Sequence, residues 1–362
     1  MQGRRGGQRA YTGPERYVSG TYLLAPEVAK PATEGTAQHG EALAAGASAI
    51  ILNVFSRGIY VEVRIRAPMD ALWELTQRPD LHARWDLRFT SISYLPRAGE
   101  SGPQRFRYET RMGFGVRVRG DGETTGTKEA PGGARASALR FWSADPNSLI
   151  RRGSGYWRYV PAADAVTFLT RYDYETRYGA AGRLVDRVVF RPLLGWATAW
   201  SFDRLRLWAE AGLDPAVALE RSVVHAVARV ALAAIWLYQG LVPKLLAPDG
   251  GELAILAGAG LTPGSALVAL RLLGAAELAF AAALLWWWRS PILLLINVAA
   301  LVVLGLGAAI SAPEVYVAPF NPATLSAAMI ALSAVGIVAG RGPLPSARRC
   351  RRRPPRAEEG ES

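Results

Sequence analysis

The sequence predicts an α+β soluble domain, with a curved antiparallel sheet around a long C-terminal helix, followed by an all-α bundle of four transmembrane helices. Residues 56–210 alternate apolar, polar and aromatic side chains as soluble domains do. Residues 222–340 are dominated by Ala, Leu, Val, Ile and Gly, in four stretches near the ~20 residues that span a bilayer. Residues 211–221 are the expected linker, and 362 residues leave room for both parts.

Both ends of the chain are expected to be disordered. Residues 1–55 contain Arg, Gly, Pro and Ser without an apolar signal-peptide core, so they are a disordered leader or an over-long translation start. Residues 341–362 form a basic cytoplasmic tail, with seven arginines and no acid up to residue 356. Basic ends beside a membrane favour anionic lipid headgroups. The lipid bilayer is therefore the expected partner and nucleic acid is not, although nucleic-acid binding by these ends is the alternative.

The soluble part begins with a strand at 59–65, where apolar and polar residues alternate. Two short helices follow within 67–86, and then strand-like segments separated by Gly, Pro, Asp and Asn. A long helix at 182–210 is expected to kink at Pro192, because proline has no amide hydrogen and clashes with the preceding turn. The strand-like segments lie at about 87–95, 104–112, 115–129, 134–143, 150–160 and 165–178.

This order of elements, with "APMDALWELTQRPDLHARWD" after the first strand, resembles the START-like (SRPBCC) superfamily, which includes polyketide cyclases and coenzyme Q-binding proteins. The resemblance covers about residues 58–208. It implies a helix-grip fold that encloses an apolar cavity between the sheet and the last helix. It also implies that a lipid or another hydrophobic molecule binds there.

The residues expected to line this cavity come from three elements. In the last strand, alternate aromatic residues share one face; on the last helix, apolar residues recur at helical spacing; one more is in the first short helix. A packed core without a cavity is the alternative for each of them. They are Trp73, Phe168, Tyr172, Tyr174, Val189, Leu193, Trp196 and Trp200.

No catalytic residue, metal site or cofactor is predicted. The chain has three histidines, and His82 is the one within the sheet domain, in a setting typical of a helix end. No spacing links it to a nucleophile. The single cysteine, Cys350, cannot form a disulfide framework or a cysteine-based metal site.

The four expected spans are residues 222–242, 264–288, 291–311 and 322–340. Arginines precede the first span, lie between the second and third, and follow the fourth, whereas the opposite side has few cations. The positive-inside rule then places both termini and the sheet domain in the cytoplasm, with the bundle in the inner membrane.

The stretch "IWLYQGLVPKLLAP" (235–248), "RLLGAAELAFAAALL" in the second span and "FNPATLSAAMIALS" (320–333) resemble the DoxX-like family of four-helix membrane proteins. The match covers about residues 222–340. Its most specific part is the membrane-loop motif with Gln239, Pro243 and Lys244. The family includes subunits associated with thiosulfate:quinone oxidoreduction. The spans contain a single histidine, which argues against a haem-type cofactor.

Glu277 lies near the middle of the second span, where an acid is expected to serve a function and to have a partner. Helix-rise arithmetic puts Arg229 of the first span and Asn297 of the third at similar depth. The sequence therefore predicts an intramembrane polar cluster of Arg229, Glu277 and Asn297. Polar contacts that only specify helix packing are the alternative.

The leading hypothesis is a membrane-anchored protein that binds or transfers a small hydrophobic ligand, such as a lipid or quinone, without covalent chemistry. The first alternative is an enzyme, either a subunit of a quinone-linked membrane oxidoreductase or a cyclase acting in the cavity. The second is a scaffold for partner subunits or for copies of itself, since "GIVAG" at 336–340 offers a small-residue packing face.

Overall fold

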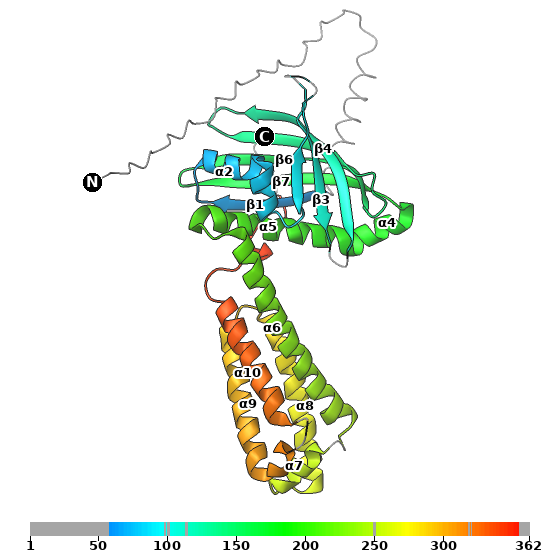
Figure 1. The fold of residues 1–362 in the computed structure, drawn as a ribbon, viewed down its shortest axis with the longest axis vertical. Helices are drawn as coiled ribbons and strands as arrows, with labels where there is room; N and C mark the ends of the chain where they lie inside the picture. Colours follow the sequence, from blue (N-terminus) through cyan, green and yellow to red (C-terminus); the bar gives the residue numbers. More distant parts are fainter. Residues whose placement is uncertain are drawn as a thin grey trace, which may run out of the picture.

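The computed structural model describes residues 58–354, apart from residues 98, 100, 101, 113, 114, 249, 250, 318 and 320. Within this part of the chain a sheet domain lies at one end of a bundle of long helices, and helix α6 joins the two (Figure 1). The predicted leader at residues 1–55 lies outside the described residues and stays a prediction.

Seven antiparallel strands form one sheet in the order β1-β7-β6-β5-β4-β3-β2. Glycines in β4 make room for aromatic rings of β3: a Cβ on Gly120 would lie 2.2 Å from the ring of Tyr108, and one on Gly122 would lie 2.4 Å from the ring of Phe106. These rings can therefore lie flat across the concave face. The strands are β1 (Ile59–Ile65), β2 (Ser91–Tyr94), β3 (Arg105–Arg111), β4 (Arg117–Glu129), β5 (Arg135–Trp142), β6 (Ile150–Ala162) and β7 (Ala165–Thr176).

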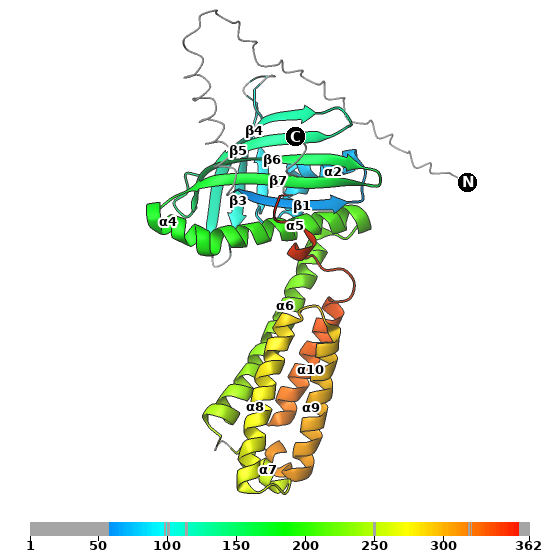
Figure 2. The same ribbon diagram turned by 180° about the vertical axis from the view of Figure 1, so that it is seen from behind.

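Two short helices, α2 (Met69–Gln77) and α3 (Pro79–Trp85), connect β1 to β2. After β7 the chain forms α4 (Gly179–Val185), the π-helical segment η1 (Asp186–Phe190) and α5 (Arg191–Ala211). Figure 1 and Figure 2 show α4 and α5 along the side of the sheet that faces the bundle. Near the predicted kink at Pro192, the helix changes to the π-helical hydrogen bonding of η1, which ends two residues before this proline. Proline has no amide hydrogen to donate, and the irregular segment lies where a regular helix would lose that bond.

The sheet domain has its own aromatic core. The rings of Phe168 and Phe202 stack with centroids 4.5 Å apart, and Trp85 meets Phe202 edge-on at 6.0 Å. All three side chains are buried. They join α3, β7 and α5, so the long helix is fixed against the sheet along its second half.

The bundle consists of four helices long and apolar enough to cross a membrane, spanning Pro215–Leu246, Pro263–Trp286, Pro291–Ser311 and Pro322–Ala339. Each starts with proline, which needs no amide partner in the first turn. Asp214, Thr262 and Asn321 cap three of them with side-chain oxygens. The elements are α6 (Pro215–Leu241), η2 (Val242–Leu246), α7 (Glu252–Gly258), α8 (Pro263–Trp286), α9 (Pro291–Ser311), η3 (Pro313–Tyr316) and α10 (Pro322–Ala339).

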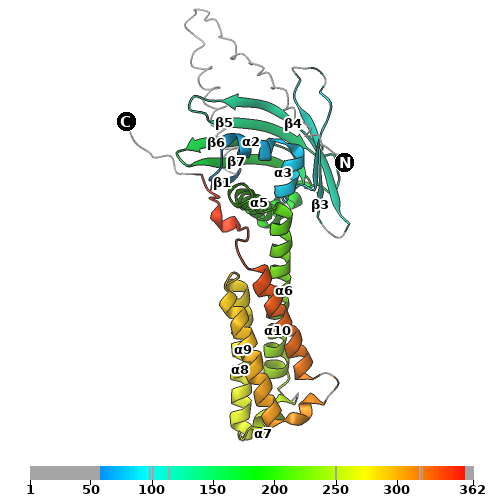
Figure 3. The same ribbon diagram turned by 60° about the vertical axis from the view of Figure 1, so that its left-hand side comes forward.

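The join between the two parts is shorter than the linker predicted at residues 211–221. Helix α5 ends at Ala211, Gly212 caps it in the left-handed conformation with a φ of 64°, and α6 starts at Pro215. His225, ten residues into α6, is level with the loop after α8, because its Nε2 lies 2.9 Å from Trp288 O. The first turns of α6 therefore form a helical neck of ~15 Å between sheet and bundle (Figure 3).

Residues 344–351, here called the C-terminal strap, return from α10 to the sheet domain, which corrects the prediction of a disordered tail from residue 341. The Ser346 amide donates to the buried carboxylate of Asp203 in α5 at 2.8 Å. Arg351 then pairs with Glu62 through two backbone hydrogen bonds of 2.9 Å. Residues 344–351 are ordered because β1 is an edge strand, whose free amide and carbonyl groups accept another strand. The strap contains the short 3-10 turn η4 (Ala347–Arg349).

The described architecture confirms the predicted fold class, an α+β domain with an antiparallel sheet and a long C-terminal helix, followed by a bundle of four helices able to cross a membrane.

Candidate functional site

A cavity of about 680 Å³ lies inside the sheet domain, between the concave face of the sheet and the first half of α5. Apolar side chains form most of its wall. They come from strands β3 to β7, from the segment before β2 and from residues 185–197. A cavity of this size and character can enclose most of a small organic molecule.

Three of the eight predicted cavity residues line this space, namely Tyr172, Leu193 and Trp196. Phe168 and Trp200 instead belong to the packed core, where Phe168 has no exposed surface. For these two residues, the alternative of a packed core is the one the structure shows.

The other three predicted residues lie away from the cavity wall. Trp73 packs on Tyr159 with ring centroids 5.0 Å apart. The Tyr174 hydroxyl donates to Asp186 at 2.6 Å, outside the cavity wall. Val189 faces outward with 56% of its surface exposed. It was expected to face the sheet. Val189 lies within η1, where the hydrogen bonds span five residues instead of four, so its side chain points in a different direction from that of a regular α-helix.

A polar group missed by the sequence reasoning lies at one side of this apolar wall. His82 and Arg88 both line the cavity, and the carboxylate of Asp86 lies behind them, fully buried. Nε and Nη2 of Arg88 donate to the two oxygens of Asp86 at 2.9 and 2.6 Å. The imidazole Nε2 of His82 lies 3.0 Å from Asp86 Oδ2.

The protonation states of this group follow from its surroundings. Burial alone would raise the pKa of Asp86, but the guanidinium of Arg88 and the hydrogen bond to His82 outweigh it and hold the pKa well below its usual range. Burial lowers the pKa of His82, although Asp86 opposes this. His82 is therefore neutral near pH 7, with its proton on Nε2 toward Asp86, and Nδ1 is left as an acceptor.

Tyr172 completes the group. Its ring lies 5.4 Å from the guanidinium carbon of Arg88, and its hydroxyl is 2.8 Å from Thr198 Oγ1. Thr198 donates its own hydrogen to Leu194 O, so Tyr172 is the donor in that pair. Within the described lining, Arg88 and Arg111 supply charge and no carboxylate does. The cavity therefore suits an apolar molecule with an oxygen that accepts hydrogen bonds.

The signal that could have revealed this group was present in "LHARWDLR". His82 and Asp86 are four residues apart, which puts them on one side of a helix turn, and Arg88 is two residues further on. The sequence could not show that the next segment, Leu87–Phe89, lines the cavity.

No cluster of three or more His, Cys, Asp or Glu side chains that could hold a metal ion occurs within residues 58–354 as described.

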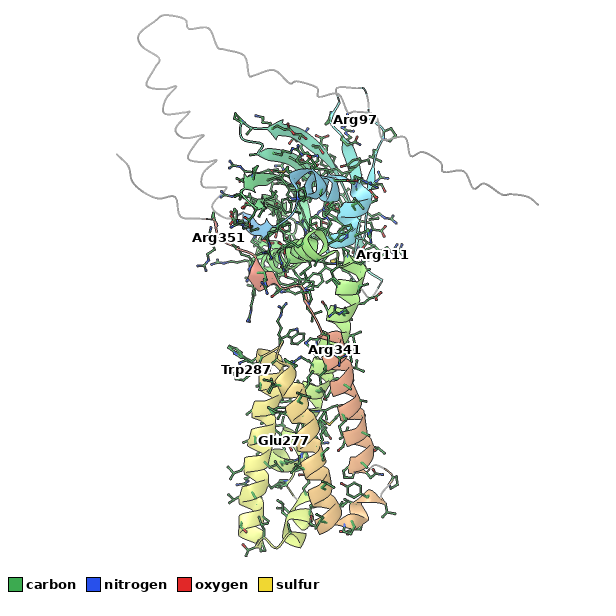
Figure 4. All side chains as sticks on the ribbon, turned by 90° about the vertical axis from the view of Figure 1, so that its left-hand side faces the viewer. Arg97, Arg111, Glu277, Trp287, Arg341 and Arg351 are labelled. Atoms are coloured by element: carbon green, nitrogen blue, oxygen red, sulfur yellow. The ribbon has the colours of Figure 1, made fainter. Side chains whose placement is uncertain are left out.

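The intramembrane acid Glu277 has a different partner from the one predicted. Its Oε2 lies 3.2 Å from Nζ of Lys244, and the same ammonium is 3.0 Å from Glu252. The Lys244 and Glu277 side chains are each 6% exposed, near the middle of the bundle's length (Figure 4). Two carboxylates thus share one cation, and water has little access to Lys244 and Glu277. A buried ion pair is stable only when its geometry is good enough to offset the loss of hydration.

The membrane-loop motif explains how Lys244 reaches this position. A Cβ on Gly240 would lie 2.7 Å from Gly274 O, so glycine is needed where α6 and α8 touch. Pro243 lies in the π-helical segment η2, which places Lys244 toward α8, and Gln239 accepts a hydrogen bond from Lys244 Nζ through its carbonyl oxygen at 3.2 Å. π-Helical segments often occur at functional sites.

Arg229 lies too close to the sheet-side end of the bundle to join Glu277, which corrects the predicted cluster. It is fully buried and donates to Leu284 O at 3.0 Å, to Trp287 O at 3.3 Å and to Ser290 O. The last carbonyl groups of α8 have no helical partner, so Arg229 caps this helix from its neighbour.

Asn297 forms a third, separate contact group. Its side-chain oxygen accepts from Trp236 Nε1 at 2.6 Å, and its amide donates to Ser333 Oγ at 2.8 Å. These bonds join α6, α9 and α10. The depth estimated from helix rise therefore failed for Arg229, and it gave no information on which side of each helix Glu277 and Asn297 would face.

Comparison with known proteins adds to this picture. Residues 233–334 match the model of the DoxX-like family. The uncharacterised membrane protein YndG of Bacillus subtilis (strain 168) is 49% identical over 183 residues, which is 50% of this chain and 68% of YndG. The chain belongs to the family of YndG and carries a DoxX-like region.

In this chain, the DoxX-like region contains the ion pair of Lys244 and Glu277 and the contacts of Asn297. Arg229 and the cavity lie outside it. Solved structures similar to the sheet domain were also found. The STAR-related lipid transfer protein of Xanthomonas axonopodis is 18% identical and covers 41% of this chain and 82% of its own, with a TM-score of 0.32. The Zhui aromatase/cyclase of Streptomyces sp. R1128 is 18% identical and covers 44% of this chain and 98% of its own, with a TM-score of 0.33.

Proposed function

We propose that this membrane protein binds a small hydrophobic molecule in the cavity of its sheet domain and holds one oxygen atom of that molecule beside Arg88. The bundle anchors this binding domain to the bilayer. The ligand is bound or transferred without covalent chemistry.

The observation that carries this proposal is the combination of a cavity of about 680 Å³ with an apolar wall and one polar side. The apolar wall stabilises a hydrophobic ligand by removing it from water. Arg88 is already oriented by Asp86, so a ligand oxygen meets a donor that loses little freedom on binding.

We also propose that the sheet domain lies in the cytoplasm, beside the inner membrane. Arg221, Arg289 and Arg341 lie at the end of the bundle nearest the sheet domain, and Figure 4 shows Arg341 at this end. Lys244, near the middle of the bundle's length, is buried in its ion pair with Glu277. This distribution agrees with the positive-inside rule.

Native mass spectrometry of the full chain, purified from its own membrane, tests the binding proposal. We expect a bound molecule that is lost when Leu139→Trp fills the cavity and weakened when Arg88→Lys replaces the fork of donors by one ammonium. The matched control Arg64→Lys, in an exposed pair with Asp164, should keep the ligand. Equal loss in Arg64→Lys, or an empty wild-type protein, would refute the proposal. A partner subunit in place of a small molecule would support the scaffold alternative.

A second candidate function is catalysis in the cavity, favoured by the pair of His82 and Asp86. A neutral imidazole oriented by a carboxylate is the arrangement that a general base needs. If His82 takes a proton from the ligand in a step that expels a hydroxyl group as water, His82→Gln should retain the unreacted molecule, heavier by one water than the product bound by the wild type. Identical bound molecules in both proteins would speak for binding alone.

A further inference from the structure

The large apolar side chains that the sheet domain exposes are concentrated in one area. Among the described residues from 58 to 210, eleven such side chains are exposed, and two of them, Leu87 and Tyr94, line the cavity from the segment before β2 and from β2 itself. The other nine belong to the end of the β3–β4 hairpin and to the segment from the end of β7 to the start of α5. They are Met112, Val116, Tyr178, Leu184, Val185, Val188, Val189, Leu193 and Trp196.

These side chains surround the opening of the cavity. Met112, Val185, Leu193 and Trp196 line the cavity and are also between 42% and 56% exposed. The opening therefore has two apolar borders, here called the lips: the hairpin lip (Met112 and Val116) and the helix lip (Leu184–Trp196). A ligand that enters or leaves passes between them.

Both lips are on the side of the sheet domain that faces the bundle. Figure 1 shows α4 and the adjoining ends of β3 and β4 on this side, and in Figure 4 Arg111, the last residue of β3, is on it as well. The bundle fixes where the bilayer surface lies, because Trp286 and Trp287 are exposed at the end of α8, at the level where such residues meet headgroups.

The distance is short enough for contact. The neck raises the sheet domain ~15 Å above the level of Trp288, and a helix with its side chains reaches ~5–6 Å from its axis. The remaining gap is ~10 Å, and the headgroup layer itself is ~5–7 Å thick on each side of the hydrocarbon core. The helix lip therefore reaches the headgroup region or lies immediately above it.

The charges beside the lips suit an anionic lipid surface. Arg183 is exposed immediately before the helix lip, next to Leu184, and Arg187 is exposed within it, next to Val188. Apolar residues interleaved with arginines on an exposed helical segment are typical of helices that lie in the membrane interface. Anionic headgroups would attract these side chains.

We propose that the two lips dock on the surface of the protein's own bilayer, so that the cavity exchanges its ligand with the adjacent leaflet without passing it through water. This inference rests on the proposed function for the ligand, but the docking of the lips is independent of it. The occupant of the apolar surface is the bilayer itself.

Depth measurement in vesicles of phosphatidylcholine and phosphatidylglycerol tests the docking. In full-length protein carrying Cys350→Ser, a nitrobenzoxadiazole dye is attached at Val188→Cys or, as a control on the far half of β4, at Thr127→Cys. We expect nitroxide lipids to quench most of the fluorescence at residue 188 and none at residue 127. Quenching at residue 188 by aqueous iodide alone would overturn the inference. Disulfide-linked dimers through residue 188 would do so too, by showing that a second copy covers the lips.

Uptake of a pyrene-labelled fatty acid from the same vesicles tests the route. Leu184→Asp/Val188→Asp should slow uptake severalfold and leave equilibrium binding in detergent micelles unchanged, whereas Thr125→Asp/Thr127→Asp should change neither. Equal uptake in all proteins would overturn the inference while leaving the proposed function intact. Failure of the wild type to bind the probe in micelles would refute the proposed function, and the depth measurement would still decide the docking.

Discussion

The buried pair of Asp86 and Arg88 allows a quantitative prediction. The Asp86 side chain is 0% exposed and that of Arg88 13%, so Asp86→Asn leaves a guanidinium largely buried without its counter-charge. Breaking a buried pair on one side costs ~3–5 kcal/mol. At ~2–4 °C per kcal/mol for a domain of this size, the sheet domain should unfold roughly 6–20 °C lower.

The assay is thermal unfolding of the full chain in detergent, followed by tryptophan fluorescence from the sheet-domain core. The matched control is Asp164→Asn, because Asp164 pairs with Arg64 where both side chains are more than 60% exposed. That change should cost ~0–1 kcal/mol. The double variant Asp86→Asn/Arg88→Met should recover part of the loss, since it removes the unpaired charge. If Asp86→Asn is no more destabilising than Asp164→Asn, the assignment of a tightly held buried pair is wrong.

Three further predictions concern other parts of the chain. Burial lowers the pKa of His82 below 6.5, so as the pH falls the unfolded state takes up this proton first; stability should be complete above about pH 6.5 and decline below it, and His82→Gln should flatten this part of a denaturation–pH profile. Gly240→Leu should lower the unfolding temperature of the bundle, by the ~1–3 kcal/mol of overpacking or more, because its Cβ meets Gly274 O at 2.7 Å; Gly264→Leu, with nothing within 4 Å, should not. Burial raises the pKa of the Cys350 thiol to about 12, so alkylation by iodoacetamide at pH 8 should require unfolding, and rapid labelling of the native protein would show that the strap is detached.

The strands and helices could be predicted because their signals are local. Alternation in the first strand marks side chains that point in turn to the two faces of a sheet, as Val63 and Ile65 are buried and Arg64 between them is exposed. The four spans follow from length and hydropathy. Neither signal depends on how distant segments meet.

The cavity wall and the ion pairs depend on angles that the sequence does not reveal. One π-helical segment before Pro192 turned Val189 outward, and another before the end of the first span turned Lys244 toward Glu277. Helix-rise arithmetic gives depth along an axis but not direction around it. The sequence also gave no sign that an arginine-rich tail would find a free strand edge at Glu62.

The C-terminal strap limits how the sheet domain can turn. A domain joined to its anchor by one helix can swivel about that helix, but here a second tie runs from Arg289, which holds the carbonyls of Leu344 and Pro345, to the edge of β1. Helix α6 and the strap attach to the sheet domain at different points, so the domain cannot rotate about either connection alone. The sheet domain therefore keeps a constant orientation relative to the bundle, and any movement of the C-terminal end of α10 is passed through Ser346 to α5, the helix that forms one wall of the cavity.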